Sequence, residues 1–288
     1  MNGYSADVEN IGLFMDWLQL LILAIVQGLT EFLPVSSSAH LILPSKIMNW
    51  PDQGPMIDLM AHLGSLGAVL IYYRRDVGRM IAGGFDILSF NNERMQKPQA
   101  KLAFHILIAT PPALITGLTM SIVGWDELVR SPLIIAWAMI GFGVVLWLSD
   151  IMGKKLKTIE TMNWKSAVLI GLAQMIAFIP GTSRSGITMT AARALGYTRS
   201  EAARFSMLLA IPTILAGGAY AFLKLLTSDG AMQVSLQDGL IVAALSLVAA
   251  YIAIYIFMKL IEKVSFFPFM IYRFLLGGAI LYWLAYIN

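Results

Sequence analysis

The stretch QGLTEFLPVSSSAH, residues 27–40, decides the fold because it breaks the first apolar segment of the chain at Pro34. The apolar segment before the break lies near 17–33, and the segment after it lies near 37–48. A helix needs about 20 residues to cross roughly 30 Å of hydrocarbon. The segment near 37–48 is too short for that, so we expect the chain to enter the membrane and turn back as a re-entrant hairpin.

A second break of the same kind, PGTSRSG at residues 180–186, follows an apolar segment near 165–179 and precedes a short one near 184–195. Both breaks carry hydroxyl residues that suit the start of a helix. The two halves of the chain also resemble each other. QGLTEFLPVSSS from Gln27 compares with QMIAFIPGTSRS from Gln174 once one residue is skipped, and PLIIAWAMIGFGVVLW from Pro132 compares with PFMIYRFLLGGAILYW from Pro268.

The composition places the chain in lipid. Of its 288 residues 58% are hydrophobic and 13% are charged, and the mean hydropathy is +0.74, which is more apolar surface than a soluble domain can bury. The remaining apolar segments lie near 55–73, 102–122, 131–149, 202–226, 237–258 and 268–287. We predict an all-α polytopic membrane protein with one membrane domain, residues 1–288. Its two inverted repeats, about 17–150 and 160–288, each contain a re-entrant hairpin and three transmembrane helices, and this odd number of spans turns the second repeat upside down.

Lysine and arginine are distributed unevenly between the connections. The stretches after 55–73, 131–149 and 237–258 are rich in these residues, whereas 123–131 and 227–238 are poor in them. The positive-inside rule assigns the rich stretches to the cytoplasm and both termini to the periplasm. The first hairpin then enters from outside and the second from the cytoplasm, so their tips can meet near the midplane. We expect no cleavable signal peptide. The sequence contains no cysteine, which excludes disulfides and thiolate catalysis.

The first tip, residues 27–40, carries groups suited to acid–base, metal and nucleophilic chemistry. Gln27 and Glu31 are spaced i, i+4 and lie on one helical face, where they can share a metal ion or a hydroxyl partner. A carboxylate in an apolar segment is costly unless it is paired, metal-bound or hydrated, which makes Glu31 a functional candidate. The alternative is an interfacial residue beyond the apolar core. The serines at 36–38 and His40 follow closely and favour the functional interpretation.

The second tip, residues 180–186, suits a phosphate group. Its glycines allow close approach of the backbone, its hydroxyls and N–H groups face whatever lies before the helix start, and Arg184 adds a forked cation. The alternative is an ordinary Gly/Ser turn with Arg184 extended to lipid headgroups. Cleavage of a phosphoanhydride needs a nucleophile, positioning and neutralisation of charge. The two tips together offer all three.

Three other polar residues lie in apolar segments. We expect His105 to be a hydrogen-bonded core histidine, and Arg273 to pair structurally or to meet lipid phosphate. His62 lies in a Gly-rich helix, HLGSLG, and stays undecided between the core and the site.

At these residues the sequence resembles the BacA-type undecaprenyl-diphosphate phosphatase family, over nearly the whole chain. QGLTEFLPVSSSAH resembles the first family motif, an (E/Q)xxxE element that leads into Ser-Ser and His, and PGTSRSG resembles the second. The resemblance implies removal of the terminal phosphate of undecaprenyl diphosphate, which recycles this lipid carrier for cell-wall synthesis. It also implies a divalent cation such as Mg²⁺ or Ca²⁺, bacitracin tolerance, and a place in the bacterial inner membrane with the site open to the periplasm.

The resemblance assigns roles to matching positions of this chain. We expect catalytic roles for Glu31, Ser37, His40 and Arg184, metal binding by Gln27 and Glu31, and phosphate binding by Ser36, Ser38, Thr182, Ser183 and Arg184. Several family members carry Glu at the position of Gln27. A neutral amide binds a metal less strongly than a carboxylate, so Glu31 is the stronger expected metal ligand.

The sequence leaves some alternatives open. The nucleophile is Ser37 with His40 as general base, or His40 itself, or water in a reaction with no covalent step. The rival function is a transporter or flippase of polyprenyl phosphate, because inverted repeats with broken helices at the midplane are typical of alternating-access carriers. We expect membrane lipids as neighbours and no nucleic acid. The oligomeric state is open, with a homodimer among the options.

Overall fold

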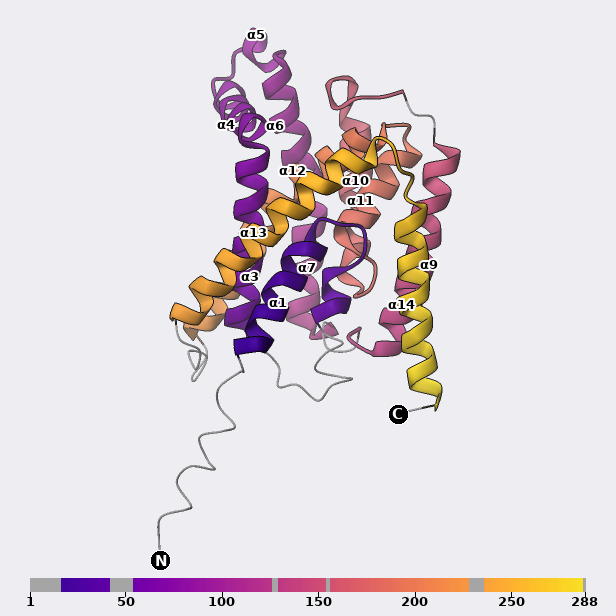
Figure 1. The fold of residues 1–288 in the computed structure, drawn as a ribbon. Helices are drawn as coiled ribbons and strands as arrows, with labels where there is room; N and C mark the ends of the chain where they lie inside the picture. The colour runs from indigo at the N-terminus through magenta and orange to yellow at the C-terminus, as the bar shows by residue number, and fades with distance from the viewer. Residues whose placement is uncertain (1–16, 42–53, 126–128, 154–155, 228–235, 287–288) are drawn as a thin grey trace, which may run out of the picture.

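The chain folds into a bundle of helices (Figure 1). The computed structural model describes residues 17–41, 54–125, 129–153, 156–227 and 236–286, and no β-strand occurs within these ranges, which confirms the predicted all-α class. The first half contains α1 (Trp17–Glu31), α3 (Gly54–Tyr72), α4 (Arg74–Leu88), α5 (Asn92–Met95), α6 (Pro98–Ala109), α7 (Pro111–Val123) and α9 (Pro132–Met152). The second half contains η1 (Ile159–Thr161), α10 (Trp164–Gln174), η2 (Met175–Phe178), α11 (Arg184–Ala194), α12 (Arg199–Thr227), α13 (Leu236–Ile261) and α14 (Phe267–Tyr286).

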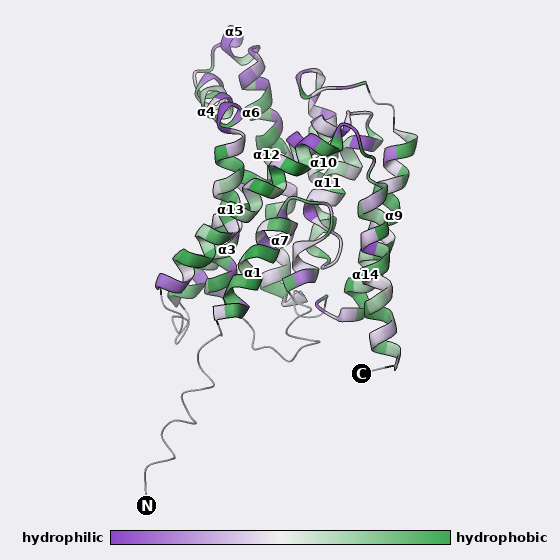
Figure 2. Cartoon of the chain, in the orientation of Figure 1, coloured by the Kyte–Doolittle hydropathy of each residue, from purple (hydrophilic) through white to green (hydrophobic). Residues whose placement is uncertain are grey.

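Six helical stretches in the described ranges are long and apolar enough to span a membrane. They are α3, the α6–α7 pair, α9, α12, α13 and α14, and they correspond to the long apolar segments predicted from the sequence. α6 and α7 make one stretch that is interrupted at Thr110, because Pro111 and Pro112 have no N–H to donate to the preceding turn. Figure 2 shows apolar residues along these helices and hydrophilic residues gathered around α4 and α5 at one end of the bundle.

The two predicted hairpins turn where the sequence breaks. α1 ends at Glu31, residues 32–35 form a turn, and residues 37–41 are helical again. α10 continues as η2, the chain turns at residues 179–183, and α11 then begins. α1 and the stretch from α10 to η2 are apolar but too short to span. Residues 42–48 of the predicted segment 37–48, both termini, and parts of the connections 123–131 and 227–238 lie outside the described residues.

Residues 74–101 differ from the expectation. The sequence marks this stretch as a charged connection, whereas the structure forms α4 and α5 and begins α6 within it. Asp76 of α4 accepts hydrogen bonds from Arg204 of α12 at 2.5 Å and from Arg79 at 3.5 Å. Gly83 packs on the backbone of Gln99 at the start of α6. These contacts pair the charges and hold α4 against its neighbours, so the stretch can be helical despite its charge.

Small residues let the helices pack closely in the bundle. A Cβ at Gly64 of α3 would lie 2.1 Å from the carbonyl oxygen of Ala243 in α13, and a Cβ at Gly171 of α10 would lie 2.4 Å from that of Ala109 in α6. Helices in lipid associate through such close contacts, because the hydrophobic effect does not act between them. α1 and α3 therefore pack on α13, and α10 packs on α6.

A buried ionic cluster joins four helices at the C-terminal end of α9. Asp150 accepts hydrogen bonds from Arg193 of α11 at 3.0 Å, from Arg199 of α12 at 2.8 Å, and from the backbone N–H of Phe266, next to α14, at 3.2 Å. Asp150 and Arg193 are both 0% exposed. Removal of one partner from a buried pair typically costs about 3–5 kcal/mol, so this cluster is an anchor of the fold.

Candidate active site

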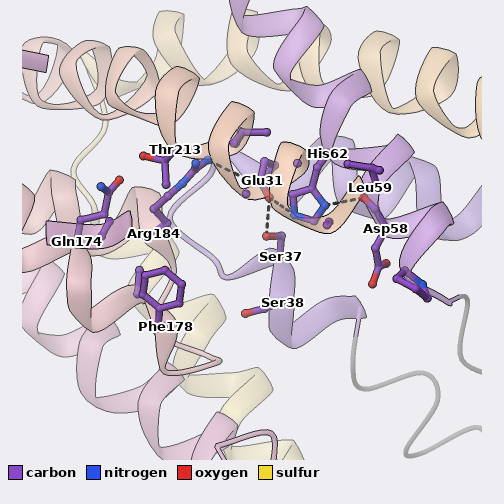
Figure 3. Close-up of a pocket in the computed structure, with 17 residues that line it drawn as sticks. Glu31, Ser37, Ser38, Asp58, Leu59, His62, Gln174, Phe178, Arg184 and Thr213 are labelled. Carbon is purple, nitrogen blue, oxygen red and sulfur yellow. Dashed lines mark hydrogen bonds and ion pairs between the residues drawn. The ribbon is translucent and has the colours of Figure 1, made fainter. Parts of the chain in front are cut away.

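The two hairpin tips meet inside the bundle (Figure 3). Arg184, the first residue of α11, donates from Nη2 to Oε1 of Glu31, the last residue of α1, at 2.8 Å. Ser185 donates to the backbone carbonyl oxygen of Leu33 at 2.9 Å. Glu31 and Arg184 are 153 residues apart in the sequence. The meeting of the tips, which the charge distribution predicted, is therefore observed.

Glu31 is the centre of a buried polar cluster. Its Oε2 accepts hydrogen bonds from Gln27 Nε2 and from Ser37 Oγ, each at 2.8 Å, and lies 3.7 Å from Nε2 of His62. The Glu31 residue is only 8% exposed. A carboxylate removed from water needs such donors and a cation nearby. The spacing of Gln27 and Glu31 thus places both on one helical face, next to a hydroxyl partner.

A cavity of about 430 Å³ opens beside this cluster. Its polar lining comes from both tips and from α3, α10 and α12, and consists of Glu31, Ser37, Ser38, Asp58, His62, Gln174, Arg184 and Thr213. Its apolar lining comes from α3, α7, η2 and α12, and consists of Pro55, Leu59, Ala113, Ala177, Phe178, Ile214, Gly217, Gly218 and Ala221. A cavity with an apolar wall and a few convergent polar groups is typical of a small-molecule site.

In each tip, the residue before the second helix has a positive φ angle. Ser36 and Ser183 have φ angles of 75° and 72°, in the left-handed region that side-chain-bearing residues rarely adopt. Ser183 caps α11, because its Oγ accepts a hydrogen bond from the Gly186 N–H at 3.1 Å. Ser37 and Arg184 follow as the first helical residues. Strained residues of this kind tend to occur at functional sites, and here they direct Ser37 and Arg184 to one carboxylate.

The predicted phosphate-binding residues divide into two groups. Ser38 and Arg184 line the cavity. Ser36, Thr182 and Ser183 are buried in the turns: Ser36 Oγ lies 3.2 Å from Ser38 Oγ, and Thr182 Oγ1 has no hydrogen-bond partner within the described ranges. The second group therefore shapes the tips rather than the cavity surface.

His40 forms its hydrogen bonds away from Glu31. Its Nδ1 lies 2.7 Å from the carbonyl oxygen of Ser36, and its Nε2 lies 2.6 Å from the Tyr272 hydroxyl of α14, with the two rings stacked. Both ring nitrogens therefore have partners, and His40 is not one of the described residues that line the cavity. The structure thus brings the other predicted catalytic residues together without His40.

The histidine beside Glu31 is His62, which the sequence left undecided. Its Nδ1 donates to the carbonyl oxygen of Asp58 at 2.7 Å, which leaves Nε2 on the side of Glu31. His105 is buried as expected, at 6% exposure, but its Nδ1 has no hydrogen-bond partner in the described part of the chain.

Three further polar residues of the cavity were not predicted: Asp58, Gln174 and Thr213. Asp58 and His62 are spaced i, i+4 on α3, which is the same signal that singled out Gln27 and Glu31. Gln174 stands opposite Gln27 in the comparison of the two halves. Thr213 follows the proline inside α12 and carries no signal that sequence reasoning could use.

Gln27 has a feature that fits a divalent cation. The residue is 0% exposed, and its Oε1 finds no donor among the described residues. An orphaned acceptor next to a carboxylate suits an ion with oxygen ligands, such as Mg²⁺ or Ca²⁺. The described residues contain no group of three His, Asp or Glu side chains that could hold an ion.

Comparisons with known proteins cover both hairpins. The model of the family described as bacitracin resistance protein BacA matches residues 20–279. An undecaprenyl-diphosphatase of Maricaulis maris is 48% identical over 268 residues, which are 93% of this chain and 98% of that protein. An undecaprenyl-diphosphatase of Alcanivorax borkumensis is 48% identical over 272 residues, which are 94% of this chain and 100% of that protein. An undecaprenyl-diphosphatase 1 of Pseudoalteromonas translucida is 46% identical with the same coverage of both chains.

Proposed function

The chain belongs to the bacitracin resistance protein BacA family, and we propose that it is an undecaprenyl-diphosphatase whose active site is the cavity between its two hairpin tips. It is a multi-pass membrane protein. The reaction converts undecaprenyl diphosphate and water into undecaprenyl phosphate and inorganic phosphate. This returns the lipid carrier to cell-wall synthesis, and the family name agrees with the expected bacitracin tolerance.

The observation that carries this assignment is that both hairpin tips donate hydrogen bonds to Glu31. Ser37 of the first tip and Arg184 of the second tip each donate to its carboxylate at 2.8 Å, at the edge of the cavity. Transfer of a phosphoryl group needs a nucleophile, a proton acceptor and a cation around one point. Ser37, Glu31 and Arg184 supply one of each.

In the proposed route, Ser37 Oγ attacks the terminal phosphorus while its proton passes to Glu31. The bond from that phosphorus to the bridging oxygen breaks, and undecaprenyl phosphate leaves with the bridging oxygen. Water then attacks the phosphorus of the phosphoserine, the bond from that phosphorus to Ser37 Oγ breaks, and Glu31 returns its proton to Ser37 Oγ. Inorganic phosphate leaves with the oxygen and the protons of the water. Direct attack by water, with Glu31 as the base, uses the same groups without a covalent step. We assign the proton transfer to Glu31 rather than His40, because both ring nitrogens of His40 have other partners.

Charge on the diphosphate is neutralised from two directions. Arg184 binds the terminal phosphate through its forked guanidinium. A divalent cation would be held by Glu31 and Gln27, and it would draw charge from the phosphate oxygens. The hydrogen bond from Gln27 Nε2 keeps the Glu31 carboxylate oriented toward Arg184 and the cation.

The isoprenoid chain fits the apolar side of the cavity. A Cβ at Gly217 of α12 would meet nothing within 4 Å, so the wall is open there. A second cavity of about 560 Å³ shares Ser38, Pro55, Phe178 and Ala221 with the first and continues along α7 and α12. We propose that the tail leaves the site through this second cavity, between α7 and α12, and enters the lipid.

The proposed location is the bacterial inner membrane, with both termini periplasmic and the cavity open to the periplasm. The distribution of Lys and Arg between the connections supports this orientation. The homodimer stays a prediction.

Phosphate release by the purified protein in detergent tests the function. With undecaprenyl diphosphate and Mg²⁺ we expect equal amounts of inorganic phosphate and undecaprenyl phosphate, and Glu31→Gln is the matched inactive control. The rival function is a polyprenyl-phosphate transporter, which broken helices near the midplane also suit. Transport has no meaning in detergent. A protein that binds the lipid yet releases no phosphate would therefore support the transporter and contradict the phosphatase.

A further inference from the structure

Arg273 of α14 connects the two hairpin tips through their backbones. It is 0% exposed, and within the described ranges all of its hydrogen-bond acceptors are backbone carbonyl oxygens. Nη2 donates to Gly181 in the second tip at 2.9 Å, and Nη1 donates to Pro34 in the first tip at 3.4 Å. Nε donates to Met139 of α9 at 3.0 Å, and Nη2 also reaches Ala138 at 3.3 Å.

A buried cation with no carboxylate partner is an unusual choice for an apolar helix. The other fully buried arginine in the described ranges, Arg193, pairs with Asp150 in the ordinary way. The two tips explain the difference, because carbonyl groups in a turn have no helical N–H partner and need donors when they lie away from water. One planar guanidinium supplies donors to both turns at once.

The two contacted carbonyls lie close to the reacting groups along the chain. Pro34 follows Glu31 by three residues, and Gly181 precedes Arg184 by three residues. The guanidinium also touches the start of α11, because a Cβ at Gly186 would lie 3.1 Å from its Nη1. Its neighbour Tyr272 holds the first tip through the hydrogen bond with His40 at 2.6 Å. α14 therefore fixes the distance between the two turns that carry Glu31 and Arg184.

We propose that Arg273 is a positioning residue for diphosphate hydrolysis, which sets the two tips in register so that Ser37 and Arg184 meet at Glu31. It does not touch the substrate in this scheme. Misplacement of reacting groups by about 1 Å can cost about 100-fold in rate. Loss of Arg273 should therefore act on the chemical step through the geometry of the tips. The activity test of this inference rests on the proposed function, whereas the distance test does not.

The distance test uses the absence of native cysteine. Thiols are introduced at Ser38 in the first tip and at Ala177 in η2, both of which line the cavity. Spin labels on them report the distance between the first tip and the helix that leads into the second. We expect a narrow distribution in the parent and in Arg193→Lys, and a broader or shifted one in Arg273→Met. Equal distributions in all three proteins, at equal helix content and monodispersity, would contradict the proposal.

The activity test is a double-mutant cycle. A residue that acts only by placing Arg184 should matter little once Arg184 is altered. We expect Arg273→Lys to lower kcat by about 100-fold in the parent, with KM nearly constant, but by less than about tenfold in an Arg184→Lys background. Arg193→Lys is the control for a purely structural loss, and its effect should be the same in both backgrounds.

The outcomes separate the two hypotheses. If the parent releases no phosphate, the proposed function fails, while the distance test still decides on Arg273. If the parent is active and the effects of Arg273→Lys and Arg184→Lys multiply, Arg273 acts independently of Arg184 and the positioning role is wrong. Where Arg273→Met does not fold, Arg273→Lys serves for both tests, because it keeps the charge and loses the double reach of the guanidinium.

Discussion

Ser36 and Ser183 both have a positive φ angle, 75° and 72°, at the residue that precedes the second helix of each hairpin. Each follows a buried glutamine by nine residues, Gln27 in the first half and Gln174 in the second. In this register no residue has to be skipped, and Ser37 becomes equivalent to Arg184. Two copies of one hairpin would have this relationship, with one copy carrying the hydroxyl and the other the cation. The inverted orientation of the two halves stays a prediction.

Arg184→Lys should lose most activity although its charge is kept, because an ammonium cannot contact Glu31 and two phosphate oxygens with one planar fork. We expect kcat/KM for phosphate release to fall by about 100-fold or more. Arg79→Lys on α4, whose side chain pairs with Asp76 and does not line the cavity, is the matched control and should leave turnover unchanged. Near-normal kcat and KM in Arg184→Lys would mean that the single charge is all that matters.

Glu31→Gln should nearly abolish turnover, since it removes both the proton acceptor and the carboxylate proposed to hold the ion. Gln27→Glu should be tolerated, or should raise the apparent affinity for the cation, because it adds a second carboxylate on the same face of α1. Titration of Mg²⁺ and Ca²⁺ against phosphate release compares the two variants with the parent. An identical metal dependence in Gln27→Glu and in the parent would remove Gln27 from the proposed ion site.

Ser37→Ala should reduce kcat by about three orders of magnitude, because Ser37 Oγ is the hydroxyl that donates to Glu31. Ser38→Ala is the matched control: Ser38 lines the same cavity, and its hydroxyl pairs with Ser36 instead. The decrease in kcat caused by Ser38→Ala should be much smaller. Rapid quench after exposure to labelled substrate identifies the nucleophile. An acid-stable adduct indicates phosphoserine, an acid-labile adduct indicates phosphohistidine, and no adduct favours direct attack by water.

The hairpins and their contact could be predicted from the sequence for two physical reasons. A segment of fixed rise per residue cannot cross the bilayer if it is too short, so the breaks at Pro34 and Pro180 required a turn. The uneven distribution of Lys and Arg then gave each hairpin a direction, which brought Glu31 and Arg184 together. Both arguments use properties of the bilayer and need no knowledge of the packing.

Other parts of the site depend on packing that local sequence does not reveal. The partner of His40 Nε2 is Tyr272, which lies 232 residues away, so spacing alone suggested a role for His40 beside Ser37. The contacts of Arg273 could not be predicted for the same reason, because their acceptors are backbone carbonyl groups, which every residue carries. His62 stayed undecided because its distance to Glu31 depends on how closely α1 and α3 approach. The helix α4 was missed because its Asp76 is paired with Arg204, far along the chain.

Gly217→Leu should obstruct the proposed route of the isoprenoid chain. The glycine faces open space, so a leucine can be added without a clash and would fill the apolar wall beside Ala221. We expect KM for undecaprenyl diphosphate to rise by about tenfold, with little change in thermal stability. Gly278→Leu on α14 is the matched control, because a Cβ there also meets nothing within 4 Å. Equal KM values in both variants would place the tail elsewhere.

The orientation in the membrane can be tested with single cysteines, because the chain has none of its own. A cysteine at Asn92 or Thr158 should resist a membrane-impermeant maleimide in cells with a permeabilised outer membrane. A cysteine at Ser131 should label under the same conditions. This contrast follows from the assignment of the Lys- and Arg-rich connections to the cytoplasm. Labelling of Asn92 and protection of Ser131 would reverse the orientation.

The tips give the sharper test of a single site open to the periplasm. Ser38 of the first hairpin and Ala177 of the second both line the cavity, so cysteines at both positions should be labelled from the periplasmic side, and substrate should protect both. Thr182 is 0% exposed, so a cysteine there should label slowly from either side and serves as the buried control. If Ser38 labels only from one side of the membrane and Ala177 only from the other, the two residues do not share one cavity. The active site proposed between the tips would then be wrong.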